Sequence, residues 1–300
     1  MTSQFSEALG RAAQELRAAG IDSARLDARV LFAFAIGIEM DALLGCETVT
    51  KDTIRHFESL IARRAEREPL AYITGTKEFW SMSFEVGSGV LVPRPETETL
   101  IEQAMRAYPD RDAALNVLDL GTGSGCLLVT FLAHYPRATG VGVDTSLPAL
   151  AYARRNAIRH RVDTRCTFLN GEWPVADNPA FDVVFANAPY LSESEWEMCE
   201  PEIRVFEPKE AFIAGEDGLA ALRAIGPALA GQLSPSGSGF IEIGAGQADA
   251  VASILAEFGL EVRRAASDLC GVPRCLVIGR AGGGGRLAPK KSVGKGPPTR

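Results

Sequence analysis

The chain has few cysteines and histidines, and it has no long hydrophobic run. Six cysteines and three histidines are spread over 300 residues, and no two cysteines form a C-x-x-C pair. This pattern is too sparse for a disulfide scaffold or a zinc site, so we expect reduced thiols and no metal. The longest apolar run covers residues 30–38, whereas a membrane-spanning helix needs about 20. The N-terminal sequence lacks the layout of a signal peptide, and we therefore expect a soluble, cytoplasmic protein without membrane contact.

Acidic residues outnumber basic ones, except at the C-terminal end. The chain carries 38 acidic and 31 basic side chains, for a net charge of −7. Such a chain is a poor candidate for non-specific nucleic-acid binding, which depends on neutralising phosphates. Residues 281–300 are rich in glycine and proline and contain basic but no acidic residues. We predict a disordered basic tail there, which either contacts RNA or the ribosome or has no specific role.

Residues 1–70 have the apolar spacing of a small helical bundle. Apolar side chains recur three or four positions apart over residues 5–19 and again over 54–65. After Pro69 the pattern changes, and two β-like stretches at 72–73 and 79–86 predict a β-hairpin. We assign residues 1–70 to a helical N-terminal domain and 71–95 to a hairpin linker.

Strands and helices alternate from about residue 96 to residue 280, which indicates an α/β domain. Helices are expected from 126, at 148–159, at 218–232 and at 248–258. Strands are expected at 116–120, 139–143, 165–169, 182–186 and 239–243, with a closing hairpin of 261–265 and 274–278. This order predicts a Rossmann-like, mostly parallel seven-stranded sheet that binds its ligand at the C-terminal ends of the strands.

A glycine-rich loop follows the first of these strands. Gly121, Gly123 and Gly125 lack the Cβ atoms that would keep a ligand away from the backbone. Their G-x-G-x-G spacing departs from the G-x-G-x-x-G pattern of dinucleotide binders. Asp119, just before the loop, would repel a pyrophosphate but attract a cation such as the amino group of S-adenosylmethionine. A tight turn without a ligand is the alternative.

Acidic and aromatic residues stand at the ends of the next two strands. Asp144 follows the second strand, where a carboxylate can accept both ribose hydroxyls of an adenosine or cap the next helix. Glu172 can meet the adenine amino group, and Trp173 can form a flat wall for the base or belong to the core.

The fourth strand runs directly into the sequence NAPY, residues 187–190. A polar residue immediately after an apolar strand lies at the ligand-binding edge of the sheet, although an ordinary turn would also fit. NAPY is similar to the N-P-P-Y motif of methyltransferases that act on planar amino or amide nitrogens.

Together with NAPY, further motifs resemble the release factor glutamine methyltransferase (HemK/PrmC) family over roughly residues 5–280. These motifs are LAYITGTKEFW, VLVPRPETE, LDLGTGSG, FEP (206–208), GEDGL (215–219) and IEIGAGQ (241–247). The resemblance implies a class I S-adenosylmethionine-dependent methyltransferase fold. It also implies methyl transfer to the side-chain amide nitrogen (N5) of the glutamine in the GGQ loop of peptide chain release factors, with S-adenosylhomocysteine as product.

The resemblance assigns roles to individual residues. The helical domain would help to dock the release factor, and we expect a monomer. The substrate glutamine would be held by Arg94 and by the catalytic residues Asn187, Ala188, Pro189 and Tyr190. The cofactor would contact Asp119, Gly121, Thr122, Gly123, Ser124, Gly125, Asp144, Glu172, Trp173 and Asn187.

The chemistry of an amide explains the NAPY motif. An amide nitrogen is a poor nucleophile because its lone pair is delocalised into the carbonyl. Two acceptors aimed at its N–H bonds, the Asn187 side-chain oxygen and the carbonyl of residue 188, would orient it, and Tyr190 would pack on its plane. No strong base is needed before attack, because the product loses its proton easily.

Three positions differ from the family pattern or allow two roles. The family has proline where this chain has Ala188, so the site loses stiffness, and we expect slower methylation or adaptation to a different partner. Glu172 stands where the family usually has aspartate. Arg94 either organises the substrate pocket with Glu96 or Glu98 or forms an interdomain salt bridge.

Four other functions compete with this interpretation. They are an N6-adenine methyltransferase, disfavoured by the acidic charge; a paralogue that methylates another protein or a small amide; a non-catalytic adapter; and a nicotinamide oxidoreductase.

Overall fold

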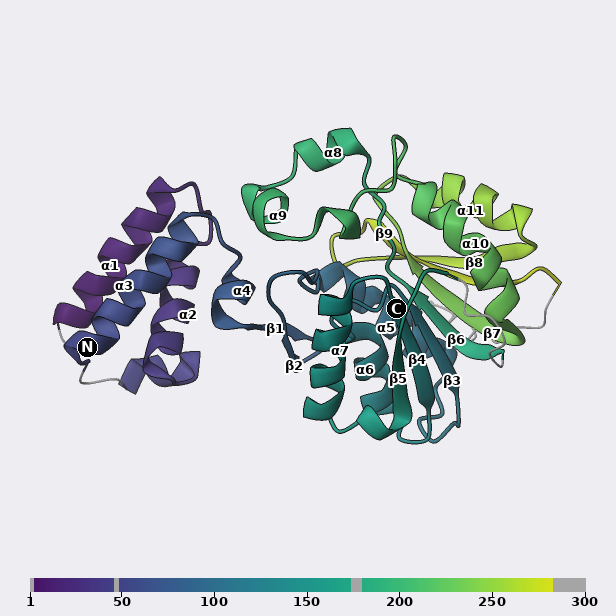
Figure 1. The fold of residues 1–300 in the computed structure, drawn as a ribbon, viewed down its shortest axis with the longest axis horizontal. Helices are drawn as coiled ribbons and strands as arrows, with labels where there is room; N and C mark the ends of the chain where they lie inside the picture. The colour runs from purple at the N-terminus through teal and green to yellow at the C-terminus, as the bar shows by residue number, and fades with distance from the viewer. Residues whose placement is uncertain (1–2, 46–48, 174–179, 283–300) are drawn as a thin grey trace, which may run out of the picture.

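The computed structural model describes residues 3–45, 49–173 and 180–282, which form a helical bundle, a hairpin and a seven-stranded sheet (Figure 1). The bundle and the segment that follows it contain α1 (Ser3–Ala18), α2 (Ala24–Ile36), η1 (Met40–Gly45), α3 (Lys51–Ala65) and α4 (Leu70–Thr74). The later helices are η2 (Pro95–Thr97), α5 (Glu98–Ala107), α6 (Cys126–His134), α7 (Leu147–Arg159), η3 (Asp163–Arg165), α8 (Glu193–Glu197), α9 (Pro201–Phe206), η4 (Lys209–Ala211), α10 (Ala220–Gln232) and α11 (Ala248–Glu257).

Helices α1, α2 and α3 form the predicted bundle, to one side of the sheet (Figure 1). Its core contains Leu16, Leu31 and the edge-to-face pair Phe32 and Phe57, whose ring centroids lie 4.8 Å apart. Thr50 caps α3 by accepting a hydrogen bond from the backbone N–H of Thr53. The apolar periodicity therefore corresponds to one shared core.

The hairpin prediction is correct in kind but wrong in its strands. Tyr72–Ile73 were expected to be extended, yet they lie in α4, which starts after Pro69 and ends at Gly75 with a φ of 73°. The strands are β1 (Thr76–Phe79) and β2 (Met82–Glu85), so the predicted single stretch 79–86 contains the turn itself. Trp80 and Ser81 form this two-residue turn with positive φ angles, although they lack the Asn-Gly signature of such turns.

The sheet is mostly parallel, as predicted. Its strands are β3 (Asn116–Leu120), β4 (Thr139–Asp144), β5 (Cys166–Asn170), β6 (Phe181–Ala186), β7 (Leu233–Glu242), β8 (Leu260–Ser267) and β9 (Pro273–Arg280). They lie in the order β5-β4-β3-β6-β7-β9-β8, and only β9 runs antiparallel to its neighbours. The C-terminal ends of β3, β4 and β6 therefore lie at the same edge of the sheet. The strand order reverses between β3 and β6, because β4 and β5 follow on one side of β3, and β6 and β7 on the other.

Alternate residues of the strands pack against helices on opposite faces of the sheet. Val117 and Phe185 belong to the core cluster that includes α5, α6 and α7, whereas Leu118 and Val184 belong to the cluster that includes α10 and α11. Figure 1 shows these two helical layers on either side of the strands. Burial on both faces explains why the strand sequences are almost continuously apolar.

Some elements differ from the sequence predictions. Helices α5, α8 and α9 were not predicted, and β7 begins six residues earlier than expected. Of the predicted tail, residues 283–300 lie outside the described residues. In the three described ranges, no helix has both the length and the apolar character needed to cross a membrane.

Candidate active site

A cavity of about 390 Å³ lies at the C-terminal ends of the parallel strands. Its walls come from the C-terminal ends of β3, β4, β5 and β6 and the loops that follow them, which contribute Gly121, Asp144, Trp173 and Asn187. Two segments without a predicted role complete it, and they contribute residues 89–91 and Pro208, Glu210 and Ala211. The cavity lies where open α/β sheets bind their ligands.

The glycine loop is shaped by backbone angles that favour glycine. Gly121, Gly123 and Gly125 have φ angles of 74°, 55° and 80°. A Cβ added at Gly121 would lie 3.5 Å from the Trp173 ring and 3.6 Å from the carbonyl oxygen of Asn187. Gly121 thus keeps open the space where three of the loops converge, and a ligand can approach the backbone there.

Asp119 lies beneath this loop, and it is not among the residues that line the cavity. Its Oδ2 accepts a hydrogen bond of 2.7 Å from Thr122 Oγ1, and its Oδ1 has no hydrogen-bond partner among the described residues. Burial raises the pKa of Asp119 to about 7, against the effect of the Thr122 hydrogen bond. The predicted cofactor residues Thr122, Ser124 and Gly125 are buried in the same place and support the loop.

Asp144 lines the cavity and holds two of its walls together. One carboxylate oxygen accepts from the backbone N–H of Gly123 at 2.8 Å, and the other accepts from that of Ser146 at 2.8 Å. Partial burial raises the pKa of Asp144, against these backbone hydrogen bonds. A carboxylate has about four acceptor positions, so Asp144 can accept further hydrogen bonds from a ligand.

Trp173 and Glu172 differ in their exposure to the cavity. Trp173 lines it and also packs against the core cluster on the α10 and α11 face. Glu172 is exposed and is not among the lining residues.

The NAPY segment connects the main cavity to a smaller one of about 30 Å³. Asn187 lines both cavities, Pro189 lines the larger one, and Tyr190 lines the smaller one together with Arg94. Ala188 is only 2% exposed and packs in the core. Three of the four residues therefore face a cavity, and Ala188 alone is turned into the protein interior.

A buried carboxylate lies behind the NAPY segment. Glu242 is 2% exposed; one of its oxygens accepts from Thr97 Oγ1 at 2.6 Å and the other from the Tyr190 hydroxyl at 3.2 Å. Thr97 Oγ1 in turn accepts from Asn187 Nδ2 at 3.3 Å. Burial raises the pKa of Glu242 to about 7, while the hydrogen bonds from Thr97 and Tyr190 lower it.

Of the two expectations for Arg94, pairing with Glu96 or Glu98 is wrong, and a salt bridge to a distant segment is what the structure shows. The Arg94 guanidinium pairs with Glu207 rather than with Glu96 or Glu98, and the other oxygen of Glu207 accepts from the Val92 backbone N–H at 2.9 Å. The side chain of Glu207 is only 1% exposed. This pair fixes the loop after α9 to the segment that precedes η2.

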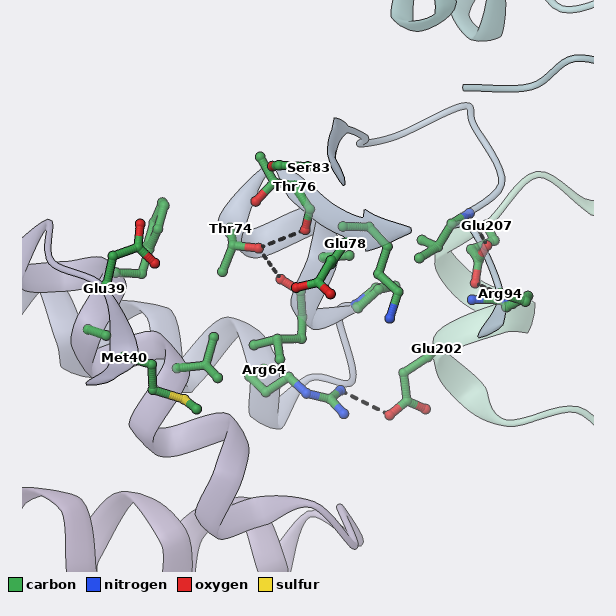
Figure 2. Close-up of a pocket in the computed structure, with 18 of the residues that line it drawn as sticks. Glu39, Met40, Arg64, Thr74, Thr76, Glu78, Ser83, Arg94, Glu202 and Glu207 are labelled. Carbon is green, nitrogen blue, oxygen red and sulfur yellow. Dashed lines mark hydrogen bonds and ion pairs between the residues drawn. The ribbon is translucent and has the colours of Figure 1, made fainter. Parts of the chain in front are cut away.

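A wide groove of about 840 Å³ separates the bundle from the rest of the molecule, and Figure 2 shows its lining. Arg64 from the bundle reaches Glu202 of α9 at 2.9 Å, and the Arg94–Glu207 pair lies at the far side of the groove (Figure 2). Apolar residues of α2, including Phe34, and polar residues of the hairpin line the walls between these two ion pairs.

Comparisons with known proteins agree over both parts of the chain. Residues 7–75 match the family described as the PrmC N-terminal domain, and residues 117–208 match a methyltransferase domain. A release factor glutamine methyltransferase from Caulobacter vibrioides is 37% identical over 90% of this chain and 94% of its own length. One from Cereibacter sphaeroides is 39% identical over 90% of this chain and 96% of its own. The chain belongs to the release factor glutamine methyltransferase family. A crystal structure of a methyltransferase from Pyrococcus furiosus aligns with a TM-score of 0.48 and 15% identity over 72% of this chain and 96% of that chain.

The family motifs contain residues whose contacts were not predicted. Thr97 lies in VLVPRPETE, Glu207 in FEP and Glu242 in IEIGAGQ. Each is a buried polar residue. Glu207 and Glu242 stand next to apolar residues, which was an available signal, whereas Thr97 lies between two glutamates and gave none. Within the described ranges, no group of three or more histidine, cysteine or acidic residues is arranged to hold a metal ion.

Proposed function

We propose that this methyltransferase transfers a methyl group from S-adenosylmethionine to the side-chain amide nitrogen of the glutamine in the GGQ loop of a peptide chain release factor. One observation carries this proposal: Asn187 lies where the large and the small cavity meet, beside the glycine loop. The names of the relatives support the substrate.

The larger cavity fits S-adenosylmethionine. Gly121 and Gly123 leave room for the ligand at the loop, Asp144 can accept the ribose hydroxyls, and Trp173 offers its ring to the adenine. The unpartnered Oδ1 of buried Asp119 supplies negative potential beneath the loop, on the side where the cationic amino acid part would lie. When bound, the sulfonium supplies an electrophilic methyl group.

The residues of this chain orient the glutamine amide. Asn187 Oδ1 accepts one N–H of the substrate amide, and the backbone carbonyl of Ala188 accepts the other. Tyr190 packs on the amide plane and closes the smaller cavity, which it lines together with Arg94. These contacts favour localisation of the nitrogen lone pair and place it in line with the methyl group, while the pocket excludes water.

We propose that residues 1–70 dock the release factor and that residues 96–280 perform catalysis. Residues 71–95 link these two domains. The interdomain groove supports this division, because it leads from α2 towards Arg94 at the smaller cavity. The proposal includes a monomeric enzyme in the cytoplasm, with Glu172 near the adenine. Ala188 makes the enzyme slower than a proline-containing relative, or suits it to a different partner.

Mass spectrometry of a purified release factor, incubated with the enzyme and S-adenosylmethionine, tests the proposal. We expect one added methyl group on the GGQ glutamine, and none with Asn187→Ala. Asn116→Ala is the matched control, because Asn116 begins β3 at the opposite end of the sheet. Cofactor binding by calorimetry without any methylation would retain the enzyme class and refute the release-factor substrate.

A further inference from the structure

Two buried residues behind Asn187 determine which way its side-chain amide faces. An asparagine amide has one end that only donates hydrogen bonds and one that accepts them. The proposed reaction needs the accepting end, Oδ1, to face the substrate. If the amide were rotated by 180°, its NH₂ group would meet the N–H bonds of the substrate glutamine, donor against donor.

Glu242 sets the direction of the hydrogen bonds in this group. No ion pair in the described part of the chain includes Glu242, and its ionised carboxylate can only accept hydrogen bonds. The hydroxyl proton of Thr97 is therefore directed to Glu242, over 2.6 Å. Thr97 Oγ1 can therefore take part in a further hydrogen bond only as the acceptor.

Asn187 must consequently turn its donating end to Thr97. The Nδ2 to Oγ1 distance is 3.3 Å, and none of the hydrogen bonds of the described residues engages Asn187 Oδ1. Since Asn187 lines both cavities, Oδ1 remains available to a ligand. The second oxygen of Glu242 accepts from the Tyr190 hydroxyl, so the same carboxylate fixes both side chains that contact the substrate amide.

We propose that Glu242 and Thr97 are positioning residues, which hold the Asn187 amide with Oδ1 towards the substrate and so select a substrate nitrogen that carries N–H bonds. This inference rests on the proposed function, because the role of Asn187 in orienting the substrate belongs to it. The effect reaches the reaction only through Asn187 and Tyr190.

The variants Thr97→Val and Thr97→Ser test the relay. Valine has the shape of threonine without the hydroxyl, whereas serine keeps the hydroxyl. We expect Thr97→Val to lower kcat for release-factor methylation roughly 10- to 100-fold at saturating cofactor, since loss of orientation costs rate. The KM for S-adenosylmethionine should stay within about twofold, and Thr97→Ser should restore most of kcat. Thr99→Val is the matched control, because Thr99 lies two positions further on, in α5, is buried as Thr97 is, and should tolerate the change.

The pH profile separates positioning from support of the fold. Protonated Glu242 can donate a hydrogen bond to Thr97 and reverse the relay, so kcat at saturating cofactor should rise as the pH increases through about 7. Glu242→Gln cannot titrate, and this limb should disappear. The titratable and charged groups around Glu242 are Tyr190, Glu96, Cys126, Arg274, Cys275 and, in the same small cavity, Arg94.

A measurement without substrate keeps the relay distinct from the proposed function. In nitrogen-15 NMR spectra, the side-chain NH₂ signals of Asn187, assigned with Asn187→Ala, should exchange slowly in the wild type and faster in Thr97→Val. If this difference is seen but the wild type does not methylate release factor, the relay stands and the proposed substrate fails. If the wild type methylates release factor and Thr97→Val equals it in kcat and in exchange, the relay is refuted.

Discussion

Loss of Arg64 should strongly destabilise the helical bundle. Its side chain is 8% exposed and pairs with Asp27, which is 4% exposed, at 2.8 Å, and with Glu202 at 2.9 Å. In Arg64→Met, Glu202 keeps its pairing with Arg67, but Asp27 loses the cation that compensates its burial. Removing one partner of a buried ion pair costs about 3–5 kcal/mol. We therefore expect the bundle to lose about that much stability.

Arg63 provides a matched control one position away. It pairs with Glu68, but its side chain is 45% exposed, so Arg63→Met should cost no more than about 1 kcal/mol. The double variant Asp27→Leu/Arg64→Met removes both buried charges and should recover most of the stability.

Hydrogen exchange of the backbone amides of α2 and α3 measures this effect within the full chain. A loss of about 3–5 kcal/mol corresponds to exchange on the order of 10²- to 10⁴-fold faster in the core of the bundle. Equal rates in Arg64→Met and Arg63→Met would refute the reasoning, as would a double variant no more protected than Arg64→Met.

Three further predictions concern other parts of the molecule. Gly121→Ala should weaken S-adenosylmethionine binding at least about 10-fold by calorimetry, because of its positive φ and its place at the cavity, while Gly171→Ala, with open space around it, should not. Asp119 has a pKa of about 7 when folded and about 4 when unfolded, so its contribution to stability decreases as the pH rises from about 4 to 7; Asp119→Asn should flatten this slope in urea titrations. Iodoacetamide should alkylate exposed Cys270 before buried Cys275, whose thiol pKa is raised by burial, as read by peptide mass spectrometry; equal rates would contradict the fold.

The sheet and its ligand-binding edge were predictable because their signals are local. The apolar run of β3 stops at the glycine loop, and that of β6 stops at Asn187, so each loop was identified from neighbouring residues. Parallel strands then bring these loops together without further information. Tyr72–Ile73 were mispredicted for the opposite reason. Their aromatic and β-branched side chains favour a strand, but Ile73 is buried in the core of the bundle, and this tertiary contact outweighs local preference.

The partners of buried charges could not be predicted, because they are far apart in the sequence. Two roles were expected for Arg94, pairing with a nearby acid in its own motif or a salt bridge between domains. Its partner is Glu207, which follows α9, 113 positions later. Thr97 and Glu242 are separated by 145 positions and meet only because η2 packs near the end of β7. Such pairs depend on the assembled fold, since many acids in the sequence could have satisfied the same cation or hydroxyl.

The segment from α9 to η4 links the groove beside the bundle to the two cavities at the strand ends. At one end, Glu202 binds Arg64 and Arg67 of the bundle. Further along, Glu207 holds Arg94 beside the smaller cavity, and Ala211 lines both the smaller and the larger one. Ion pairs and packing within one short stretch of about ten residues therefore join the bundle to the walls around Asn187. The proposed docking of a release factor in the groove would place it against a segment whose other end lines the proposed cofactor cavity.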